Sequence, residues 1–115
     1  MRVLIKESSI DKAVTTWAKA RWPSMVVRKL STLGPRGSNG DPDRLFLWNG
    51  KLLLIEMKRP GGECTPLQLQ RHAEWRAAGA MVAVVSDVAA GRAVLSQFFD
   101  GKRRSFSSAL AATPL

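Results

Sequence analysis

Two strand-forming segments joined by an Asn-Gly pair constrain the fold of this chain more than any other feature. The segments cover residues 44–48 and 51–58, and Asn49-Gly50 lies between them. An Asn-Gly pair in this position predicts a tight β-hairpin turn. Asp43 precedes the first segment and Glu56 lies near the end of the second, so we expect the two carboxylates on adjacent antiparallel strands.

The second strand ends in charged side chains that an apolar strand does not require. Leu52 to Ile55 is wholly apolar, yet Glu56 and Lys58 follow it, and alternation along a strand places these two side chains on one face. An isolated Glu-x-Lys is most simply a solvated ion pair. Its combination with Asp43 indicates instead that Asp43 and Glu56 hold a divalent metal, with Lys58 facing the chemistry, because buried charges must be paired or coordinated.

The residues around this hairpin resemble the signature of the PD-(D/E)XK nuclease superfamily. Pro42-Asp43 and Glu56-Met57-Lys58 match the two halves of that signature. Further residues resemble its VRR-NUC branch, namely Gly40, Arg44, Arg59 to Gly62, and Thr65 to Gln68. The resemblance extends over about residues 7–86.

The resemblance implies roles for individual residues. Asp43 and Glu56 would bind Mg²⁺ or Mn²⁺, with the backbone carbonyl of Met57 as a further ligand. Lys58 would orient the attacking water or neutralise charge in the transition state. The family pattern includes a glutamate on the first helix, and Glu7 stands where it is expected, to bind the metal through water or to hold a second ion. From the residues alone, Glu7 fits equally well as an acidic residue that complements the helix dipole.

Gln68 has a structural and a functional interpretation. At the third helical position after Thr65, it completes a capping box. It also shares a helix face with Trp75, so Gln68 points toward Glu56 if Trp75 packs on the sheet. The family pattern has glutamine near the active site, and we therefore include Gln68 among the catalytic candidates.

The composition indicates a polyanionic partner. The chain of 115 residues has 18 Lys and Arg against 9 Asp and Glu, a net charge of +9. Charge alone does not separate nucleic acid from an anionic membrane, but together with the nuclease resemblance it favours DNA. The candidate phosphate contacts, whose alternative role is solubility, are Arg36, Arg44, Lys51, Arg59, Lys102, Arg103 and Arg104.

The rare residue types exclude several chemistries. One Cys and one His cannot supply a Cys/His zinc cage, and a chain without Tyr cannot form a tyrosine-linked intermediate. We expect Cys64 to be a spectator in a loop and His72 to be a polar helix residue rather than a catalytic base. No segment approaches the ~20 apolar residues of a membrane span, and no signal-peptide pattern is present. These features predict a soluble, cytoplasmic protein, in the host cytoplasm if it is phage-encoded.

The pattern of elements predicts one α/β domain over residues 1–100 and a basic tail over 101–115. Its order is helix, three-stranded antiparallel meander, helix, strand and helix, a restriction-endonuclease-like mixed sheet flanked by helices. The segment 81–85 reads as a strand buried within that sheet. The expected elements are helices over 8–21, 65–79 and 87–99 and strands over 25–30, 44–48, 51–58 and 81–85.

We therefore predict a metal-dependent DNA endonuclease. The resemblance to stand-alone, phage-type members implies a homodimer that is selective for branched DNA such as Holliday junctions. Phe98 and Phe99 on the last helix are candidates for the dimer contact, and equally for the core. The alternatives are a non-catalytic DNA-binding module and a restriction-like or RNA-directed nuclease. Clustered carboxylates repel DNA and disfavour the binding module.

Overall fold

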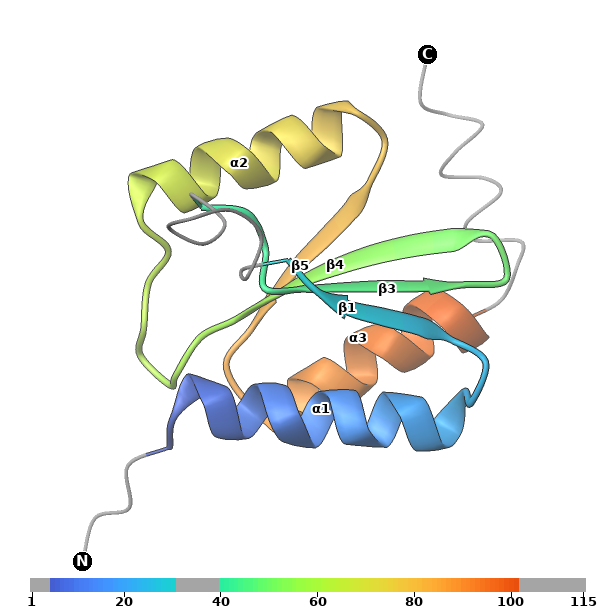
Figure 1. Ribbon diagram of the computed structural model, residues 1–115. Coiled ribbons are helices and arrows are strands. Elements are labelled where there is room, and N and C mark those ends of the chain that lie inside the picture. Colours follow the sequence, from blue (N-terminus) through green and yellow to red (C-terminus); the bar gives the residue numbers. More distant parts are fainter. Residues whose placement is uncertain (1–4, 31–39, 102–115) are drawn as a thin grey trace, which may run out of the picture.

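A four-stranded mixed sheet with helices on both faces forms the protein, as the computed structural model shows for residues 5–30 and 40–101 (Figure 1). The predicted element order is confirmed. The elements are α1 (Glu7–Arg21), β1 (Val26–Lys29), β3 (Arg44–Trp48), β4 (Lys51–Met57), α2 (Pro66–Ala77), β5 (Met81–Val85) and α3 (Val88–Asp100).

The strands lie in the order β1-β3-β4-β5. The first three form an antiparallel meander, and β5 pairs parallel to β4 after the crossover through α2. Helices α1 and α3 cover one face of the sheet and α2 covers the other (Figure 1). The expected mixed α/β architecture is therefore correct.

The predicted hairpin is present, with a turn that needs left-handed backbone. Asn49 has a φ of 52° and Gly50 a φ of 75°, the conformation that Asn-Gly supplies in a type I′ turn. The register pairs Arg44 with Ile55. Extending this register by one residue brings Asp43 beside Glu56, so the turn chemistry sets the spacing of the two carboxylates.

The main core lies between the sheet and the pair α1 and α3. Leu53 and Ile55 of β4 are fully buried there with Val14 of α1. At Gly91 of α3, an added Cβ would lie 2.7 Å from Val14 Cγ2, so a residue without a side chain lets the two helices approach closely. This packing leaves the end of β4 free to present polar groups on the opposite face.

Aromatic side chains close the hairpin end of the core. Phe99 lies 5.6 Å from Trp22 and 6.3 Å from Trp48, measured between ring centroids, and only 4 % of its surface is exposed. Phe98 is half-buried and packs edge-on against Phe99. Phe99 therefore belongs to the core of the monomer and not to a free dimer surface.

Two details differ from the sequence prediction. Helix α1 begins at Glu7 rather than Ser8, and Lys6 precedes it without a side-chain capping hydrogen bond. Strand β5 lies at an edge of the sheet, not within it, because in the described part of the chain it pairs only with β4. Met81 and Val84 are accordingly 46 % and 43 % exposed.

Candidate active site

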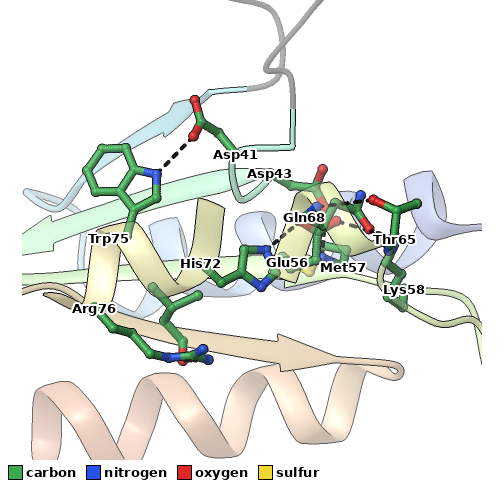
Figure 2. A network of polar contacts seen from close by, with 11 residues as sticks. Asp41, Asp43, Glu56, Met57, Lys58, Thr65, Gln68, His72, Trp75 and Arg76 are labelled. Carbon is green, nitrogen blue, oxygen red and sulfur yellow. Dashed lines mark hydrogen bonds and ion pairs between the residues drawn. The ribbon is translucent and has the colours of Figure 1, made fainter. Parts of the chain in front are cut away.

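Asp43 is held against the end of β4 by a backbone hydrogen bond. It directly precedes β3, and its Oδ2 accepts a hydrogen bond of 2.7 Å from the backbone amide of Met57 (Figure 2). The backbone carbonyl of Asp43 also accepts a hydrogen bond of 2.9 Å from the amide of Leu30. These contacts fix the carboxylate next to Glu56, as the hairpin predicted.

Glu56 is a buried carboxyl group with an altered acidity. Only 1 % of its surface is exposed. Burial first, and then the neighbouring charge and hydrogen bond of Asp43, raise the pKa of Glu56 from 4.5 to about 8, against the opposing effect of Lys58. In the absence of a cation, Glu56 therefore holds a proton at neutral pH.

Lys58 shares a face with Glu56, as alternation along the strand predicts. Its Nζ lies 3.9 Å from Glu56 Oε2, and only 7 % of the residue is exposed. The backbone amide of Lys58 donates a hydrogen bond of 2.8 Å to the carbonyl of Val85, which anchors the chain as β4 ends. The amine is thereby kept beside the carboxylates.

His72 is a member of this cluster that the sequence did not reveal. It lies on α2, has no exposed surface, and places Nε2 at 3.2 Å from Glu56 Oε1. Burial, with the charges of Arg76 and Lys58, lowers the pKa of His72. It was expected as an ordinary polar helix residue, and its position four residues after Gln68, on the same helix face, is the one signal that could have indicated otherwise.

Comparisons with known proteins show which family the chain resembles. No family model matches the chain. The chain is 38 % identical over 87 residues to "Putative nuclease p44" of Acyrthosiphon pisum secondary endosymbiont phage 1, which covers 71 % of this chain and 84 % of the relative. A solved structure described as a VRR_NUC domain is 30 % identical, with a TM-score of 0.60 over 78 % of this chain and 98 % of its own.

The chain belongs to the VRR-NUC domain family. The resemblance read from the Pro-Asp and Glu-x-Lys residues is thus confirmed. A second solved structure, a VRR_NUC domain protein of 16 % identity, supports the fold with a TM-score of 0.68 over 87 % of this chain and 93 % of its own. None of the helices within residues 5–30 and 40–101 has the length and apolar character needed to span a bilayer.

In this VRR-NUC chain, Gln68 occupies the predicted capping box at the start of α2. Its Oε1 accepts a hydrogen bond of 2.9 Å from the amide of Thr65, whose hydroxyl accepts one of 3.1 Å from the amide of Gln68. Figure 2 shows both residues beside the Glu56 and Lys58 cluster. The structure thus confirms the cap and leaves the catalytic role of Gln68 as a prediction.

Trp75 connects α2 to the segment that carries Asp43. Its Nε1 donates a hydrogen bond of 3.0 Å to Asp41 Oδ1. At Gly40, with a φ of 94°, an added Cβ would lie 3.0 Å from Leu67. Helix α2 therefore packs closely on the Gly40 to Pro42 segment and helps to hold Asp43 in place.

The remaining predicted metal-site residues lie close to the cluster. Glu7 is exposed in the first turn of α1, and its negative charge contributes to the raised pKa of Glu56. The side chain of Met57 is in the core, so only its backbone groups face the site. Cys64 lies half-buried in the loop before α2, where burial raises the pKa of its thiol.

Apart from Arg44, the predicted phosphate contacts fall into three groups. Arg59 is exposed directly after Lys58. Lys51 lies at the opposite end of the hairpin, with Nζ 3.5 Å from the carbonyl oxygen of Phe98. Arg36, Lys102, Arg103 and Arg104 lie outside the described residues.

Arg44 is the predicted phosphate contact for which the structure provides another role. Its guanidinium donates hydrogen bonds of 2.8 and 2.9 Å to the two carboxylate oxygens of Asp11, and both side chains are largely buried. A bidentate pair of this kind satisfies the guanidinium geometry. Arg44 therefore joins β3 to α1, and we do not retain it as a DNA contact.

Proposed function

We propose that this VRR-NUC protein is a divalent-metal-dependent endonuclease that hydrolyses phosphodiester bonds in DNA. The observation that carries the proposal is the cluster of Asp43 and Glu56, two carboxyl groups in hydrogen-bond contact, with the Lys58 amine 3.9 Å from Glu56. The name of the phage relative, a nuclease, agrees with this chemistry. A strand end that only stabilised the fold would not need a buried glutamate beside a half-buried aspartate.

The donor set fits Mg²⁺ or Mn²⁺. Among residues 5–30 and 40–101, no group of three or more His, Cys, Asp or Glu side chains is arranged to hold a metal. Mg²⁺ sites commonly use only one or two carboxylates, completed by water and substrate phosphate. Asp43 and Glu56 would hold the ion, with the Met57 carbonyl and a water-mediated contact from Glu7. The raised pKa of Glu56, to which the charge of Asp43 contributes, marks a place where a cation would relieve the repulsion between two carboxylates.

The chain's own groups would position the reacting atoms. When bound, the metal would supply positive charge that stabilises the negative charge gained by the phosphoryl group. Lys58 donates hydrogen bonds only, so it can orient the attacking water or neutralise the transition state, and its burial strengthens that effect. The Met57 amide keeps Asp43 in a fixed orientation throughout.

The substrate in this proposal is DNA, and branched DNA in particular. The net charge of +9 favours a polyanion, and Arg59 presents an exposed cation beside the cluster. Paired incisions in a four-way junction require two active sites, which a twofold-symmetric homodimer would supply. Sedimentation at micromolar concentration, with and without DNA, tests the dimer, and monomer in both samples would contradict it.

One cleavage experiment tests the activity. The full chain is incubated with Mn²⁺ and duplex, single-stranded, flap or four-way-junction DNA, with the Asp43→Asn variant as the control. We expect cutting of at least one form by the wild-type protein only, with the junction or flap preferred. Matched RNA substrates distinguish a DNA endonuclease from an RNA-directed nuclease. A protein that binds DNA but neither cuts it nor binds Mn²⁺ would instead be the non-catalytic binding module.

A further inference from the structure

The sole histidine of the chain, His72, is buried against the acidic cluster. Its Nε2 lies 3.2 Å from Glu56 Oε1, while Glu56 Oε2 faces Lys58 Nζ at 3.9 Å. Figure 2 shows the imidazole reaching from α2 to the end of β4. Each oxygen of Glu56 therefore has its own neighbour, one on each side of the carboxyl group.

The other imidazole nitrogen indicates where the ring proton lies. His72 Nδ1 is buried, and it has no hydrogen-bond partner among the described residues. A neutral imidazole has one N–H donor and one bare acceptor nitrogen, and a buried N–H without an acceptor is rare in proteins. The proton is therefore expected on Nε2, where it can be donated to an ionised Glu56, while Nδ1 is the bare nitrogen.

We propose that His72 is a positioning residue that holds Glu56 in its metal-binding orientation by donating a hydrogen bond from Nε2 to Oε1. This inference rests on the proposed function and assigns a role to a residue outside the Asp43, Glu56 and Lys58 set. Hydrogen bonds to the ligands of a metal fix their orientation, and their loss typically lowers metal affinity or activity roughly 10–100-fold.

A neutral donor suits this position better than a cation or an apolar side chain. A Lys or Arg at this distance would neutralise Glu56 and compete with a divalent ion for its charge. An apolar residue would leave Oε1 buried without a partner. A neutral imidazole orients the carboxylate and leaves its negative charge available.

Three variants of the full chain test the role. His72→Leu removes the donor, and His72→Gln retains an N–H that reaches a similar position. The control, Val82→Ala, loosens the packing on the same sheet face, because Val82 is paired with Leu54 and is only 6 % exposed. Mn²⁺ affinity is measured by calorimetry, thermal stability by unfolding, and DNA cleavage as separate kcat and KM values.

We expect His72→Leu to weaken Mn²⁺ binding roughly 10–100-fold and to lower kcat with little change in KM. His72→Gln should restore most of the affinity, and Val82→Ala should lower stability without affecting Mn²⁺. A His72→Leu variant that is merely less stable but binds Mn²⁺ normally would overturn the positioning role. Equal losses in the Leu and Gln variants would also overturn it, because the donor would then not matter.

A wild-type measurement keeps the proposal testable if His72→Leu does not fold. Because the chain has one histidine, its imidazole ¹⁵N signals need no assignment. With saturating Mg²⁺, we expect the tautomer protonated at Nε2, and a tautomer protonated at Nδ1 would refute the proposed donor. If the wild-type protein binds no metal, the proposed function and this inference both fail. If the wild-type protein binds metal and His72→Leu binds it equally well, only the inference fails.

Discussion

The backbone amide of Met57 donates a 2.7 Å hydrogen bond to Oδ2 of Asp43, and this contact joins the acidic residue before β3 to the end of β4. The orientation of Asp43 therefore depends on an acceptor oxygen, whereas its proposed metal binding depends on a negative charge. Substitutions that separate these two properties distinguish structure from catalysis.

Asp43→Asn retains an oxygen that can accept the Met57 hydrogen bond but removes the charge. We expect cleavage to fall about a hundredfold or more, with the fold intact and DNA binding retained or tighter, because less negative charge then faces the phosphates. Glu56→Gln should behave in the same way. Gel-based cleavage and DNA-binding assays on both variants check this prediction, and normal cutting by either would contradict the nuclease proposal.

Lys58 is expected to act in the transition state rather than in metal coordination. Lys58→Ala should lower kcat by about 10²–10³-fold while Mn²⁺ binding remains largely intact. Lys58→Met is the matched variant, because it keeps an apolar stem in the buried position. Calorimetry and single-turnover cleavage on both variants separate binding from chemistry. Loss of Mn²⁺ binding in both would show that Lys58 supports the metal site instead.

The predictable part of the site depends on local sequence. Asn49-Gly50 determines the hairpin turn, and strand alternation places Glu56 and Lys58 on one face, so their proximity to Asp43 follows from neighbouring residues. Thr65 and Gln68 likewise identify the start of α2 through a capping box that spans four residues. Such features require no knowledge of how distant elements pack.

The unpredicted part depends on packing between elements. His72 joins the cluster only because α2 docks with one particular face on the sheet, which a helical spacing alone does not specify. Arg44 pairs with Asp11, 33 residues earlier in the chain, and thereby loses its apparent freedom to contact phosphate. The exposure of Met81 follows from the edge position of β5, and a fully apolar strand gives no indication of its place in the strand order.

The capping box provides a test of the second role of Gln68. Thr65→Ala and Gln68→Ala each remove part of the same cap, and each should cost about 1 kcal/mol of stability. If Gln68 also acts in the active site, Gln68→Ala should lower kcat further than Thr65→Ala does. Unfolding and cleavage measured on both variants decide the question, and equal cleavage at equal stability would restrict Gln68 to the cap.

Arg59 is the described candidate for a phosphate contact beside the cluster. Arg59→Gln should weaken duplex binding and reduce the slope of log K against log salt by about 0.9, the value for one phosphate contact. Lys19→Gln is the matched control, because Lys19 is exposed near the C-terminal end of α1. That end of the helix lies at the hairpin turn, away from the cluster, since Trp22 directly after α1 packs on Trp48. Equal salt slopes for both variants would mean that Arg59 contacts no phosphate.

The raised pKa of Glu56 makes the stability of the metal-free protein depend on pH. Between its ordinary pKa of 4.5 and its folded value of about 8, the folded state binds the proton that the unfolded chain releases. The free energy of unfolding therefore falls as pH rises through this interval, by up to about 1.4 kcal/mol per pH unit. The lowered pKa of His72 has the opposite effect on stability below about pH 6.5, because there the imidazole of the unfolded chain binds a proton that the folded one does not.

From pH 6.5 to 8 the contribution of Glu56 consequently dominates, because the unfolded imidazole is at most half protonated there. Chemical denaturation of the metal-free protein should show decreasing stability across this interval, and Glu56→Gln should flatten the dependence because its side chain does not titrate. Mg²⁺ should stabilise the wild-type protein most at the upper end, where a proton competes least with the cation for Glu56, because the cation binds the folded state only. A wild-type profile as flat as that of Glu56→Gln would show that Glu56 is already ionised at pH 6.5, and the raised pKa of Glu56 would then be wrong.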